Sequence, residues 1–140
     1  MPTIGRVRAR LNHGLLPLLL CAAATVQAAQ LDVDGNGAVA PETDGTLILR
    51  HLFGFSGTAL TTGALGAGAT RDAAAITAYL ADTGALWDVD GDGRSDALTD
   101  GVLIMRYLLG RTGSALTQGA IAPGATRTTP EQIAPRAEPF

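Results

Sequence analysis

Residues 32–37 read DVDGNG and residues 88–93 read DVDGDG, so each hexapeptide places acidic or amide side chains at alternate positions before a glycine. A hard cation such as Ca²⁺ takes about six to eight oxygen ligands from carboxylates, amides and carbonyls. Side chains at positions 1, 3 and 5 of a tightly curled loop point inward together, and glycine at position 6 permits the sharp turn. One such motif is often only a turn, but two copies, each followed by a helical pattern, predict two calcium ions.

Two sets of candidate ligands follow from this spacing. Positions 1, 3 and 5 supply side-chain oxygens, position 7 supplies a backbone carbonyl, and position 9 ligates directly or through water. The carboxylate that closes a standard loop at position 12 stands one residue later in both copies. The predicted metal ligands are Asp32, Asp34, Asn36, Ala38 (carbonyl) and Asp44 in the first loop, and Asp88, Asp90, Asp92, Arg94 (carbonyl), Asp96 and Asp100 in the second.

The closing residues Asp44 and Asp100 allow a second interpretation, because an Asp in the first turn of a helix also favours the helix dipole. We favour ligation, since a loop without a closing carboxylate binds calcium weakly. Position 9 is Ala40 in the first loop, where water has to fill in, and Asp96 in the second. The second site is therefore expected to bind more tightly. Mg²⁺ suits these loops less well because it retains more of its waters.

Both loops belong to an internal duplication. Residues 31–71 align with residues 87–127 at a constant offset of 56, and 23 of the 41 aligned positions are identical. Each unit is therefore one structural module. The stretches LILRHLFG (47–54) and LIMRYLLG (103–110) each predict a short amphipathic helix that ends at a glycine. With an Ala-rich helix predicted over 72–82, the expected fold class is all-α, a small pair of calcium loop-helix units with an intervening helix.

The remaining segments give weaker signals. The stretches 57–71 and 113–127 are rich in Gly, Ala and Thr, and no periodicity assigns a structure to them. Residues 128–140 carry three Pro and predict a poorly ordered tail. The expected domain therefore spans residues 29–127.

The first 28 residues have the layout of a secretory signal peptide. Three Arg precede an apolar run over 15–24, and Val26-Gln27-Ala28 offers small residues at the −3 and −1 positions of a cleavage site. The run is short for a membrane span, and Leu20 stands where a lipidated Cys21 would need a small residue. We expect a secreted or periplasmic protein with no membrane span after signal cleavage.

The composition of the chain argues against several classes of function. The 140 residues carry a formal net charge of −3. Without residues 1–28 the chain keeps seven Arg against thirteen Asp and Glu, so the charge becomes −6. An acidic chain argues against nucleic acid as a partner, and a single Cys argues against a disulfide framework or a Cys-based zinc site. No Ser-His-Asp or Cys-His arrangement indicates catalysis, so we do not expect an enzyme.

Each loop with its helix resembles the calcium-binding unit of type I dockerin domains, which is similar to half of an EF-hand. The motifs that carry the resemblance are DVDGNG with LILRHLFG and DVDGDG with LIMRYLLG. The resemblance implies two units with near-twofold symmetry that dock on a cohesin-like or cell-surface protein. Two alternatives are an accessory component of an extracellular polysaccharide-degrading system and a simple extracellular calcium-binding protein without a docking partner.

Overall fold

The computed structural model describes residues 30–137, so the predicted signal peptide over 1–28 lies outside the described residues. Within this range every regular element is a helix, which confirms the all-α expectation. The elements are η1 (Pro41–Gly45), α2 (Thr46–Leu52), α3 (Gly57–Thr61), α4 (Ala73–Asp82), η2 (Gly84–Leu86), η3 (Ala97–Gly101), α5 (Val102–Leu108), α6 (Ser114–Thr117) and α7 (Pro130–Ala137).

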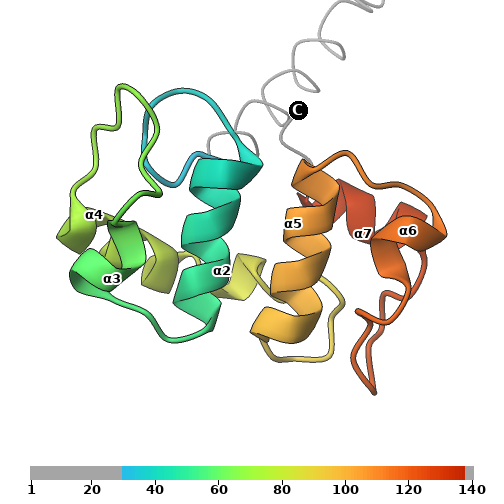
Figure 1. Ribbon diagram of the computed structural model, residues 1–140. Helices are drawn as coiled ribbons and strands as arrows, with labels where there is room; N and C mark the ends of the chain where they lie inside the picture. The colour runs from blue at the N-terminus through green and yellow to red at the C-terminus, as the bar shows by residue number, and fades with distance from the viewer. Residues whose placement is uncertain (1–29, 138–140) are drawn as a thin grey trace, which may run out of the picture.

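The two repeats lie side by side, with α2, α3 and α4 in one half of the molecule and α5, α6 and α7 in the other (Figure 1). Helices α2 and α5 meet in the middle. Turn η1 at the start of α2 contacts α5, and turn η3 at the start of α5 contacts α2. The exchange of contacts is reciprocal, as expected when two copies of one module pack together.

Each central helix begins with a π turn. The N–H of Gly45 donates to the carbonyl of Ala40 at 3.1 Å, and the N–H of Gly101 donates to that of Asp96 at 3.1 Å. These bonds span five residues instead of the four of an α-helix, so the turn holds one extra residue. The closing Asp of each loop, displaced by one position in the sequence, lies within this turn.

The apolar faces that the sequence predicted for the central helices lie in the core, beside buried residues from the loops and the other helices. Leu47, Ile48, Leu103 and Ile104 are buried, with Leu52 and Leu108 packed at the edge of the core. Helix α4, predicted over 72–82, is present as Ala73–Asp82 and is capped by Asp72, whose side chain accepts the N–H of Ala75 at 2.8 Å. Burial of each large aliphatic side chain contributes about 1.5–3 kcal/mol.

Glycines allow the central helices to approach closely. A Cβ at Gly101 would lie 2.7 Å from Cδ1 of Leu49, and a Cβ at Gly45 would lie 3.1 Å from Cδ1 of Leu108. Each glycine directly follows the closing Asp of its loop. The start of each helix, and with it the end of each loop, is therefore fixed by the helix of the other repeat.

The expectation of a poorly ordered tail over 128–140 is wrong for the described part of that segment. Residues Pro130–Ala137 form α7, which packs against α5 and α6 and buries Ile133 completely. Pro130 is compatible with the first turn of a helix, where its missing N–H has no partner to lose. The side-chain oxygen of Gln132 accepts the N–H of Thr129 at 3.2 Å, as in a capping box.

Candidate metal centre

Three carboxylates gather at one end of each repeat. Asp32, Asp34 and Asp44 form the first group, and Asp88, Asp90 and Asp100 form the second. Within each group, one oxygen from each side chain lies within 4.8 Å of those of the other two. Both groups could hold a metal ion, and all six residues were predicted as ligands from the sequence.

The closing carboxylate is buried and connects the two ends of its loop. One oxygen of Asp44 accepts the N–H groups of Val33 and Asp34 at 2.7 and 3.3 Å, and the other accepts that of Ala40 at 2.9 Å. Asp44 is fully buried. Its side chain therefore reaches both the start of the loop and the residue before the helix, while remaining in the acidic group.

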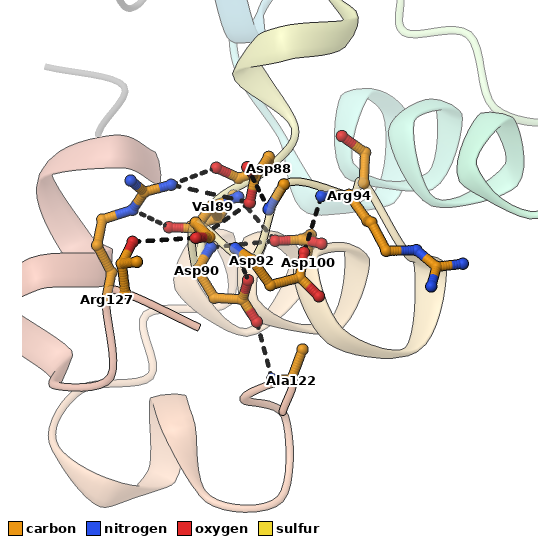
Figure 2. A network of polar contacts seen from close by, with 12 residues as sticks. Asp88, Val89, Asp90, Asp92, Arg94, Asp100, Ala122 and Arg127 are labelled. Atoms are coloured by element: carbon orange, nitrogen blue, oxygen red, sulfur yellow. Dashed lines mark hydrogen bonds and ion pairs between the residues drawn. The ribbon is translucent and has the colours of Figure 1, made fainter. Parts of the chain in front are cut away.

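The second repeat reproduces this geometry. Asp100 is fully buried, and one of its oxygens accepts the N–H groups of Val89 and Asp90 at 2.7 and 3.1 Å. Its other oxygen accepts the N–H of Asp96 at 2.9 Å. Figure 2 shows this carboxylate beside the loop that carries Asp88 and Asp90. The one-residue displacement thus places the closing Asp among the other carboxylates in both copies.

Asp92 and Asp96, which were also predicted as ligands, are not members of the second carboxylate group. The side-chain oxygens of Asn36 and Asp92 accept the N–H groups of Ala38 and Arg94, both at 2.8 Å, which curls each loop. The Asp96 side chain is 52% exposed, and its carboxylate lies 3.8 Å from Nε of Arg94. Ligation by Asn36, Asp92 and Asp96, and by the carbonyls of Ala38 and Arg94, stays a prediction.

Burial gives the closing carboxylates an unfavourable electrostatic environment. Loss of solvation raises the pKa of Asp44 and of Asp100 above the ordinary value of 3.8, and the neighbouring Asp34 or Asp90 raises it further. Hydrogen bonds from backbone N–H groups oppose this shift. A bound cation would offset the repulsion, and a site with oxygen donors alone suits a hard cation such as Ca²⁺.

The Gly-, Ala- and Thr-rich segments, which the sequence left unassigned, complete both loops. The N–H of Gly66 donates to Oδ2 of Asp34 at 2.6 Å, and the N–H of Ala122 donates to Oδ2 of Asp90 at 2.8 Å. We call residues 66–71 and 122–127 the clamp segments. Their shared ending, GATR, was visible in the sequence, but nothing in its composition indicated a contact with the loop.

A clamp residue also explains the glycine at loop position 4. Gly35 has a φ of +73°, and a Cβ placed there would lie 2.5 Å from Oγ1 of Thr70. That hydroxyl donates to the Gly35 carbonyl at 2.8 Å. Both the positive φ and the close approach of the clamp therefore require glycine at this position.

No protein-family model, no curated protein and no solved structure matches the chain. The resemblance to dockerin domains therefore stays a prediction. Among residues 30–137, no helix combines the length and the apolar character needed to cross a membrane.

Proposed function

We propose that the protein is a secreted, non-catalytic calcium-binding module of the dockerin type, with one Ca²⁺ in each repeat. The observation that carries the proposal is the pair of matching acidic groups, each of which includes two fully buried carboxylates. Such carboxylates are costly to bury together without a cation. Asp32, Asp34 and Asp44 would hold one ion, and Asp88, Asp90 and Asp100 the other.

In this proposal calcium contributes to the folding free energy. The chain has few large apolar side chains, and small domains of this kind depend on additional constraints. A ligand that binds the folded state stabilises it in proportion to the logarithm of its concentration over its dissociation constant. Because each closing Asp joins the loop to a central helix, the ion would stabilise the packing of both repeats.

Circular dichroism tests the metal-binding proposal. We expect EDTA to reduce the helical signal and the melting temperature, and excess Ca²⁺ to restore both. Mg²⁺ at the same concentration is the control and should restore less, because it prefers fewer protein ligands. Identical spectra and melting curves in EDTA and in Ca²⁺ would count against calcium as a structural ligand.

The second part of the proposal is that the folded module attaches to a partner protein. Support comes from exposed apolar side chains at matching places in the two repeats. Phe53 and Leu109, which follow α2 and α5, are 54% and 57% exposed. Capture of one protein from the source secretome in Ca²⁺, and its loss in EDTA, is the expected result. A Phe53→Ser variant that captures the same protein equally well would place the docking surface elsewhere.

A further inference from the structure

Two arginines, Arg71 and Arg127, contact the backbone carbonyls at the start of the metal loops through their side chains. Nη1 of Arg71 donates to the carbonyl oxygens of Asp32 and Val33 at 2.6 and 3.0 Å. In the second repeat, Nη2 and Nε of Arg127 donate to the matching carbonyls of Asp88 and Val89, both at 2.5 Å. A guanidinium is always charged and has no acceptor, so neither arginine could be a metal ligand.

The rest of each clamp segment extends this contact. The carbonyl of Asp34 accepts the N–H groups of Thr70 and Arg71 at 3.0 and 3.1 Å, and the carbonyl of Gly35 accepts the Thr70 hydroxyl. The carbonyls at loop positions 1 to 4 are thus all bonded to the clamp. With those carbonyls held, the side chains at positions 1 and 3 are directed into the acidic group.

The second repeat has the same arrangement. The carbonyl of Asp90 accepts the N–H of Arg127 at 2.8 Å, and the carbonyl of Gly91 accepts the Thr126 hydroxyl at 3.0 Å. Figure 2 shows Arg127 reaching the loop beside Asp88, whose Oδ1 lies 3.9 Å from Nη2. The positive charge therefore lies next to the carboxylates as well as on the backbone.

The guanidinium of Arg71 is itself held in place. It lies over the ring of Tyr79 in α4, with Cζ 4.2 Å from the ring centroid, and the Tyr79 hydroxyl donates to the carbonyl of Gln30. A stacked arginine that also bonds two carbonyls is fixed in orientation, which a lysine cannot reproduce.

We infer that Arg71 and Arg127 are positioning residues for the metal loops, each preparing the loop of its own repeat to receive the ion. The inference rests on the proposed calcium binding. The inference also gives a reason for the sequence GATR in both repeats, because its Thr and Arg side chains and its backbone contact the loop. A loop that is held open for the ion loses less conformational entropy on binding, and this raises affinity.

The chain offers a matched control for this role. Arg50 in α2 donates through Nη1 to the carbonyls of Leu60 and Thr62, at 2.9 and 2.8 Å. Arg106 in α5 makes the same pair of bonds to Leu116 and Gln118. These arginines also hold backbone carbonyls with a guanidinium, each through Nη1 alone, but the backbone that they hold belongs to α3 and α6 or the residue after them, not to a metal loop.

The test compares Arg127→Lys with Arg106→Lys in the whole protein. Lysine keeps the positive charge near the carboxylates but cannot donate to two carbonyls from two nitrogens, as Nε and Nη2 of Arg127 do. A change in Ca²⁺ affinity would therefore come from the lost hydrogen-bond geometry and not from a lost charge. We expect Arg127→Lys to bind Ca²⁺ about tenfold more weakly at the second site, the loss of roughly one charge-assisted hydrogen bond. The first site should keep its affinity, and Arg106→Lys should lower the melting temperature while leaving both affinities unchanged.

Amide chemical shifts report the two sites separately. The N–H of Gly37 donates to Asp32 at 2.9 Å and the N–H of Gly93 donates to Asp88 at 3.1 Å, so each amide follows one loop. In EDTA, Arg127→Lys should shift the Gly93 amide and not the Gly37 amide. Arg71→Lys against Arg50→Lys repeats the comparison at the first site, which keeps the test available if one variant does not fold.

Three results decide between the alternatives. Unchanged second-site affinity in Arg127→Lys overturns the inference and leaves the proposed function standing. An equal loss of affinity in Arg127→Lys and Arg106→Lys also overturns it, because general destabilisation then explains the effect. Absence of saturable Ca²⁺ binding by the unaltered protein overturns the proposed function and the inference together.

Discussion

The carboxylate of Asp44 accepts the N–H of Val33 at 2.7 Å, and this bond joins turn η1, which precedes α2, to the start of the loop eleven residues earlier. Asp100 and Val89 repeat it at 2.7 Å. In each repeat the residue that closes the candidate metal site therefore also closes the loop itself. Metal binding and loop conformation are consequently linked through one side chain.

Stability in the absence of metal should depend on pH through these closing carboxyls. Burial raises the pKa of Asp44 and Asp100 above 3.8, so the folded state retains their protons at pH values where the unfolded state has released them. Their contribution to stability is full below pH 3.8 and is lost as the pH rises through the raised pKa. In EDTA, these groups should therefore lower the free energy of unfolding as neutrality is approached.

Denaturant unfolding of the unaltered protein and of an Asp44→Asn, Asp100→Asn double variant, across mildly acidic to neutral pH, measures this effect. The difference in unfolding free energy between the two proteins should change with pH in the stated direction. His51, whose pKa burial lowers, titrates in both proteins and cancels in the difference. A difference that does not vary with pH would contradict the role of the closing carboxyls.

Much of this arrangement could be predicted from the sequence, because local patterns specified it. The alternation at Asp32 and Asp34 predicted the first acidic group, and the duplication predicted the second. Displacement of the closing Asp in both copies indicated a longer loop, but only the structure explains it, as a π turn held by the facing helix. The helix propensities of the residues do not predict a π turn, because packing against the other helix compensates for its less favourable backbone geometry.

The clamp segments and α7 were missed for different reasons. The clamp bonds the loop through backbone N–H groups and through the side chains of one Thr and one Arg, so its Gly and Ala residues give no hydrophobic pattern. Three Pro made residues 128–140 look like a tail. A closer signal was present in Thr129 and Gln132, spaced as a capping box around Pro130.

Helix α7 should contribute to stability as a full part of the core. Ile133 is completely buried, and truncation to Ala should lower the free energy of unfolding by about 2–4 kcal/mol. Leu98, which is 70% exposed, is the control, and its Ala variant should stay within about 0.5 kcal/mol of the parent. Equal, small effects at both positions would restore the original expectation of a poorly ordered tail.

The close contact of the central helices should make Gly101 intolerant of a side chain. An added methyl group would lie 2.7 Å from Cδ1 of Leu49, so Gly101→Ala should destabilise the protein by about 1–3 kcal/mol although Ala is the better helix former. Gly84 has open space around its Cα and serves as the control. Thermal unfolding of the two variants gives the comparison, and a stabilised Gly101→Ala would show that the helices do not pack as described.

Calcium titration calorimetry tests the central claim most directly. The unaltered protein should bind two Ca²⁺ ions, and Asp44→Ala and Asp100→Ala should each bind one, because each variant loses the closing carboxylate of a single site. Binding of one ion by each variant would show that the other site is intact, which separates loss of a ligand from loss of the whole fold. Absence of calcium binding, or two ions bound at unchanged affinity in both variants, would contradict the assignment of these aspartates as the ligands that close two calcium sites.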